Sequence, residues 1–181
     1  PTSTGSQKHR RGLYTVWRRT VPYPSMATFD APSREICMPR RIRTNTTLQA
    51  FVTLNDPVYV EISQALGRRL VAEGGTPPAS RVAFGLRLAT GQRPSPLQQQ
   101  VLVGLFESEL AHYRNNTEAA RHIATMPLGP LSPDADAATM AAWTIVASVL
   151  LNLDPIARPH VWTPVTTLSP IPPSASTQNR P

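Results

Sequence analysis

Proline placement most restricts how this chain of 181 residues can fold. Prolines at 22, 24, 32 and 39 exclude a long helix there, because proline lacks an amide hydrogen and clashes with the preceding helical turn. Seven more fall after residue 154, where no helical period is present. The pattern predicts three parts: a basic, extended N-terminal wrap (residues 1–43), a helical domain (44–153) and a Pro-rich tail (154–181).

Apolar residues recur at helical spacing through most of the middle part. Asp56 before Pro57 is the clearest start signal, and Gly74-Gly75 is the clearest stop. We therefore predict a mostly α fold: a compact bundle of about five or six helices, with an irregular Pro-rich wrap, an extended C-terminal tail and no strand after residue 43. The predicted helical segments are 44–55, 57–73, 78–90, 95–115, 117–126 and 135–153.

Two of these segments, 95–115 and 135–153, are expected at the centre of the bundle. The second contains "MAAWTIVASVLLNL", which is apolar on most faces and places Trp143 in the core. This run is shorter than the roughly 20 residues of a membrane span, so no membrane-spanning helix is predicted. Association of the chain with a membrane complex stays open. The inner stripe of 95–115 is predicted from Leu97, Val101, Leu102, Leu105 and Leu110, and in 44–55 one helical face gathers Leu48, Phe51, Val52 and Leu54.

The net charge of +7 is confined to one part of the chain. Nine Lys and Arg stand against Asp30 and Glu35 in the wrap, whereas the remainder is neutral. No nucleic-acid motif accompanies this charge, and Arg, which forms bidentate pairs with carboxylates, outnumbers the single Lys. An acidic protein partner or an internal ion-pair network is favoured over nucleic acid.

Catalytic and metal motifs are weak. Cys37, the single cysteine, lies among arginines that would favour its thiolate, but no motif links it to a histidine base. His112 and His122 lack the spacing of metal ligands. The sequence contains no C-x-x-C-H, so no haem is expected in this chain. Neither a catalytic residue nor a metal ligand is assigned.

One set of polar residues invites a functional interpretation. It could form an anion or carbohydrate site, or it could hold an extended segment in shape through side-chain hydrogen bonds and ion pairs, and the second interpretation is favoured. In the tail, Trp162 resembles an isolated aromatic anchor for an interface. The candidate binding residues are Asp30, Arg34, Arg40, Arg41, Arg43, Asn45, Asn55, Asp56 and Trp162.

Four sequence segments between residues 10 and 69 carry a family resemblance: "RRGLYTVWRRT", "MATFDAPSREIC", "RRIRTNTTLQAF" and "LNDPVYVE". Together with "RVAFGLRLATGQRPSP" and "AAWTIVASVLLNLD", they make the chain resemble the C-terminal domain of unknown function of planctomycete-type secreted proteins. In that family a cytochrome c domain and a second domain of unknown function lie upstream. The resemblance implies a periplasmic or extracellular location, and the start at Pro1 indicates a processed chain or a fragment.

Two functions remain. The first is a non-enzymatic interaction module, an accessory subunit or domain that docks onto other subunits through 1–43 and 154–181, in an assembly that could transfer electrons. The second is the binding or catalytic part of a secreted, cytochrome-linked protein that degrades polysaccharides. The first is favoured, because no acid/base pair, nucleophile system or metal cage can be assembled from the sequence.

Overall fold

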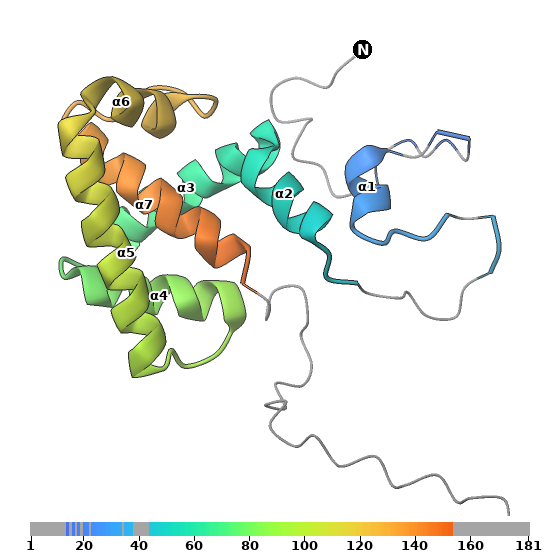
Figure 1. Ribbon diagram of the computed structural model, residues 1–181, viewed down its shortest axis with the longest axis horizontal. Helices are drawn as coiled ribbons and strands as arrows, with labels where there is room; N and C mark the ends of the chain where they lie inside the picture. The colour runs from blue at the N-terminus through green and yellow to red at the C-terminus, as the bar shows by residue number, and fades with distance from the viewer. Residues whose placement is uncertain are drawn as a thin grey trace, which may run out of the picture.

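The computed structural model describes residues 14, 16, 18, 20, 21, 23–33, 35–37 and 44–153. These residues form seven helices and no strand, which confirms the predicted mostly α fold (Figure 1). A five-residue helix lies within the wrap and six helices lie between residues 44 and 153. The helices are α1 (Pro24–Thr28), α2 (Thr47–Asn55), α3 (Pro57–Glu73), α4 (Pro78–Thr90), α5 (Pro96–Asn115), α6 (Thr117–Thr125) and α7 (Ala137–Leu151).

Side-chain caps define the predicted helix starts. The Asp56 carboxylate accepts a hydrogen bond from the backbone N–H of Val58 at 2.9 Å, and Pro57 opens α3 as predicted. At α5, Ser95 and Gln98 form a reciprocal capping box. Such caps satisfy backbone amides that have no partner within the helix, so they determine where each helix begins.

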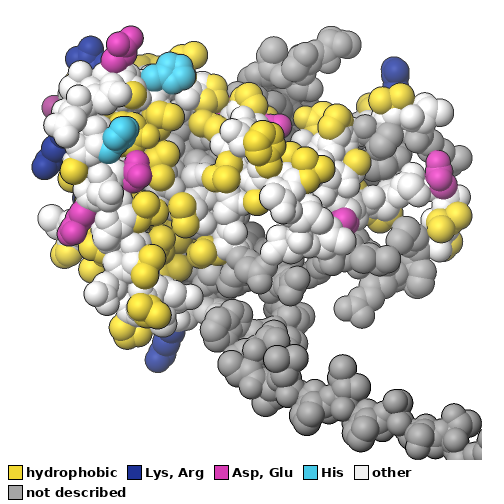
Figure 2. Space-filling model, in the orientation of Figure 1, with side chains coloured by type: hydrophobic (Ala, Val, Ile, Leu, Met, Phe, Trp, Pro, Cys, Tyr) yellow, Lys and Arg dark blue, Asp and Glu magenta, His cyan; other side chains and the backbone are white. Residues whose placement is uncertain are grey.

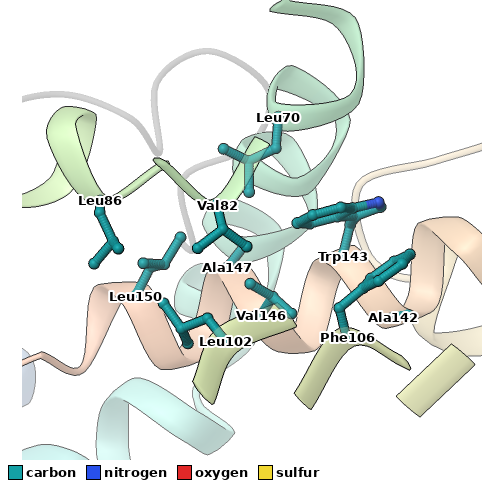
Figure 3. Packing of buried hydrophobic residues seen from close by; sticks show 10 residues of the cluster. All are labelled: Leu70, Val82, Leu86, Leu102, Phe106, Ala142, Trp143, Val146, Ala147 and Leu150. Atoms are coloured by element: carbon teal, nitrogen blue, oxygen red, sulfur yellow. The ribbon is translucent and has the colours of Figure 1, made fainter. Parts of the chain in front are cut away.

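Helix α7 is the centre of the fold, and it packs against α3, α5 and α6. The backbones of α3 and α7 approach closely, because a Cβ added to Gly67 would lie 3.1 Å from the carbonyl carbon of Trp143. The prediction that α7 is central is confirmed. Helix α3 also packs closely against α7, and this contact was not predicted from the sequence. Figure 3 shows the main cluster: Leu70, Val82, Leu86, Leu102, Phe106, Ala142, Trp143, Val146, Ala147 and Leu150.

The predicted inner stripe of α5 is partly wrong. Leu97 is 70% exposed and Val101 is 62% exposed, whereas Leu102 and Phe106 are buried. Residues 102 and 106 lie one turn apart and face α7, so Val101, which is rotated by about 100° from Leu102, falls on the neighbouring face. Phe106 was not in the predicted stripe, yet its ring stacks on Trp143 with centroids 4.3 Å apart.

A buried polar side chain connects α3 to the turn after α6. Gln64 donates from Nε2 to the carbonyls of Ile123 (2.6 Å) and Met126 (2.5 Å), and its Oε1 accepts from the N–H of Leu128 at 2.9 Å. One turn later, Arg68 donates to the carbonyls of Ala124 and Gly129. The two side chains bind backbone groups that no helix pairs, so α3 shapes the segment between α6 and α7.

Asp136 caps α7, and this cap predicts a pH dependence. Its Oδ2 accepts from the Thr139 hydroxyl at 2.6 Å and from the Thr139 N–H at 3.0 Å, and these hydrogen bonds, the hydroxyl first, lower the pKa of Asp136. Because the folded-state pKa is lowered, the ionised Asp136 contributes its full stabilisation of the fold above the ordinary Asp pKa of about 3.9. This stabilisation is lost as the pH falls through the folded-state pKa.

Between pH 5 and pH 2 the natural chain should therefore lose more unfolding free energy than an Asp136→Asn variant. Asparagine caps about as well but does not titrate, so the two chains should differ little at pH 7. Urea unfolding at several pH values measures the difference. Equal pH slopes for the two chains would contradict it.

None of the helices in the described part of the chain combines the length and the apolar character needed to cross a membrane.

Candidate functional site

Among the polar residues singled out in the sequence, the described ones lie at the ends of α1 and α2, and Asp30 makes the most contacts that connect separate segments. Asp30 follows α1 in the left-handed region (φ 58°), which Asp tolerates better than most residues. Its Oδ2 accepts from the backbone N–H of Thr44 at 2.7 Å, and both carboxylate oxygens lie 2.9 Å from the Thr44 hydroxyl. Residues 30 and 44 are thus tied together across the intervening basic loop (residues 31–43).

Gln49 extends this connection into α2. It is only 6% exposed, and its Nε2 donates to the carbonyl of Thr28 (2.8 Å), the Thr44 hydroxyl (3.1 Å) and Asp30 Oδ2 (3.3 Å). Its Oε1 accepts from the N–H of Thr46, and Thr46 caps α2 in return. We call the group Asp30, Thr44 and Gln49 the clasp, because it fastens both ends of the basic loop to the first turn of α2.

A ring contact joins the end of α1 to α3. The rings of Phe29 and Tyr59 are tilted, with centroids 5.7 Å apart. Burial, followed by the negative charge of Asp56 and by Tyr23, raises the pKa of Tyr59. The ring of Tyr59 thus supports the end of α1 from α3.

The described candidate residues do not converge on one point. Asp30 and Asn45 lie at the N-terminal end of α2, whereas Asn55 and Asp56 lie at its other end, about 13 Å away for nine residues of helix. The Asn55 amide donates to the carbonyl of Phe51 at 2.8 Å, and Asp56 caps α3. Arg34, Arg40, Arg41, Arg43 and Trp162 lie outside the described residues, so their roles stay predictions.

The sequence did not reveal the direction in which α2 faces. Its apolar side chains Leu48, Phe51 and Leu54 are 60%, 63% and 51% exposed, and we call them the α2 face. Figure 2 shows hydrophobic side chains on the visible surface over the region of α2. The polar pair Gln49 and Thr53, one turn apart, points toward the protein instead. The spacing of Gln49 and Thr53 was the sequence signal for the buried face of α2, because a buried Gln can pack inside a protein when its polar atoms have hydrogen-bond partners.

The described cysteine and histidine residues considered for catalysis or metal binding do not cluster. Cys37 is exposed as a free thiol, and His112 makes an edge contact with the ring of Tyr113. Within the ranges that the structure describes, no three His, Cys, Asp or Glu residues come together as metal ligands would.

The clasp makes a specific mutational prediction. Replacing Asp30 with alanine removes the acceptor for the Thr44 N–H and hydroxyl, and the variant should lose about 1–2 kcal/mol of unfolding free energy. Trypsin should cleave within residues 31–43 faster than in the natural chain, because the loop ends are released. Cleavage followed by mass spectrometry measures this rate. Glu35→Ala removes an equal charge outside the clasp and should leave the rate unchanged, and a similar acceleration in both variants would contradict the role of the clasp.

The geometry of the described residues indicates the class of protein. The described residues form an all-helical domain with a clasped basic loop and an exposed apolar face on one short helix, and their polar side chains mainly bond to backbone.

The family follows from comparison with known proteins. Residues 1–106 match PSD1, a family described as a protein of unknown function (DUF1553). This match takes in the wrap and the helices as far as the first half of α5, more than half of the chain, so the chain belongs to this family. No curated protein and no solved structure matches it significantly.

Proposed function

We propose that the chain is a non-enzymatic docking module, an accessory domain or subunit of a larger extracytoplasmic assembly. One observation carries the proposal: the clasp fixes both ends of the basic loop to α2. The loop holds four Arg and one Glu, in the part of the chain with all the net positive charge. A loop whose ends are held loses less conformational entropy when it binds, so an acidic protein surface is the partner that its chemistry fits.

The family resemblance supports the setting of this proposal. The cytochrome-linked proteins that the sequence resembles suggest a periplasmic or extracellular location, with a haem in a partner or an upstream domain and not in this chain. The wrap (1–43) and the tail (154–181) are the segments that we propose to meet other subunits.

The alternative, a binding or catalytic role in polysaccharide degradation, receives less support from the described residues. Asp30 accepts hydrogen bonds from Thr44 and Gln49, Asn55 bonds to the helix carbonyl of Phe51, and Asp56 caps α3. These contacts hold backbone in place, which is a structural use of the same groups that a ligand site would need.

Photo-crosslinking in the source organism tests the proposal. A benzoylphenylalanine at Ile36, an exposed loop position, should crosslink to a protein partner that mass spectrometry identifies. The same probe at Leu97, which is about as exposed but lies on α5, is the matched control. Reversing the charges of Arg40 and Arg41 to Glu should abolish the Ile36 product.

Two results would overturn the proposal. One is equal crosslinking from Ile36 and Leu97. The other is turnover of a polysaccharide by the purified chain that Asp30→Ala abolishes while the helical circular dichroism is unchanged.

A further inference from the structure

The α2 face is an exposed apolar surface next to the clasp. Leu48, Phe51 and Leu54 each expose more than half of their surface, and α2 has no charged side chain. Its occupant should therefore be apolar and nearly neutral. The acidic partner that suits the basic loop does not fit it, because charge contributes nothing to recognition there.

The described chain ends beside this helix. Thr53 of α2 donates a hydrogen bond to the side-chain oxygen of Asn152, directly after α7, and Leu153 is the last described residue (Figure 1). The Nδ2 of Asn152 is buried with no hydrogen-bond partner. A carbonyl of the chain that follows would satisfy this donor and start the tail along α2.

The sequence that follows has the required composition. Residues 155–165, "PIARPHVWTPV", contain three Pro, the apolar Ile156, Val161, Trp162 and Val165, and a single Arg. Prolines restrict such a segment to extended conformations, which lowers the entropy lost when it binds an apolar surface.

The segment is also long enough. Trp162 lies nine positions after Leu153, or about 28 Å in an extended polyproline conformation. Helix α2 is about 13 Å long and about 10–12 Å in diameter, so the tail can pass round its C-terminal end and reach all three apolar side chains. The tether raises the effective concentration of the segment near α2 to roughly millimolar.

We infer that residues 155–165 of this chain cover the α2 face, with Trp162 against Phe51 and Leu54. This inference narrows the subunit contacts proposed above: Trp162 anchors the tail to its own domain, and the wrap and residues 166–181 remain to meet other subunits. The inference concerns the isolated chain and does not depend on the proposed docking function.

Disulfide trapping tests it without any partner. In a Cys37→Ser background, Leu54→Cys with Val161→Cys should form an intramolecular disulfide about tenfold faster than Leu97→Cys with Val161→Cys, because only the first pair shares the tethered site. Non-reducing electrophoresis and peptide mapping measure the two rates at low protein concentration. Equal rates would overturn the inference, as would a 54–161 disulfide that joins two chains, which would assign the face to a second copy.

Tryptophan fluorescence gives an independent measurement. In a Trp17→Phe background, Trp143 stays buried and Trp162 reports on the tail. Phe51→Asp should shift the emission to longer wavelength and increase quenching by acrylamide, whereas Leu97→Asp should leave both unchanged. No change with Phe51→Asp would overturn the inference, because Phe51 is exposed and its replacement does not disturb the core.

Discussion

Replacing Trp143 with alanine is expected to lower the free energy of unfolding by about 3–5 kcal/mol. The side chain is fully buried on α7, its ring stacks on Phe106, and the Arg81 guanidinium lies 5.7 Å from its centroid. Gly67 of α3 approaches the backbone of the same residue. The indole therefore fills the space between α7 and its neighbours, and alanine leaves a cavity that these helices cannot close.

Urea unfolding followed by circular dichroism measures this loss as a lower midpoint at an unchanged slope. Trp143→Phe is the informative control, because the indole Nε1 is buried without a hydrogen-bond partner. Phenylalanine removes that unpaired donor and keeps most of the ring, so the loss should be only about 1–2 kcal/mol. Equal losses for the two variants would show that the ring volume is not what matters.

Replacing Gln64 with leucine should cost about 3 kcal/mol or more, although leucine is of similar size and apolar. The reason is that three backbone groups lose their partner: the carbonyls of Ile123 and Met126 and the N–H of Leu128. Gln64 is nearly inaccessible to solvent, and each unpaired buried polar group costs about 1–3 kcal/mol. The segment between α6 and α7 should loosen before the rest of the fold.

Hydrogen exchange resolves this effect by residue, with the Leu128 amide losing protection first. Ser63→Ala is the matched control, since Ser63 is a buried polar neighbour on α3 whose hydroxyl donates to the Tyr59 carbonyl of its own helix. That substitution should cost less than about 1 kcal/mol, because the helix already pairs this carbonyl. Normal protection of Leu128 in Gln64→Leu would contradict the prediction.

Helix boundaries could be predicted from the sequence because their causes are local. The Asp56-Pro57 and Ser95-Pro96 pairs supply a cap and a fixed backbone angle within a few residues, and the structure confirms both starts. The buried position of Trp143 was also predictable, since an all-round apolar helix has no solvent face.

The candidate site was less predictable because its connections are not local. Asp30 was singled out for its charge, but its partners Thr44 and Gln49 lie 14 and 19 residues away, and no pattern of composition indicates that pairing. Gln64 and Arg68 were not singled out in the sequence, yet they bind backbone about 60 residues further on. Leu48, Phe51 and Leu54 form an apolar stripe that suggests a core, and the structure turns it outward.

The sequence by itself therefore determined the six helices between residues 44 and 153, most of their starts and the segregation of charge into the wrap, because caps, proline and apolar spacing act over one or two turns. The short helix α1 within the wrap was not predicted. Only the tertiary structure decided which face of α2 is buried and which groups hold the basic loop. The reason is that Gln49 meets its partners Thr28, Asp30 and Thr44 only in the folded chain, and local apolar spacing carries no information about these contacts.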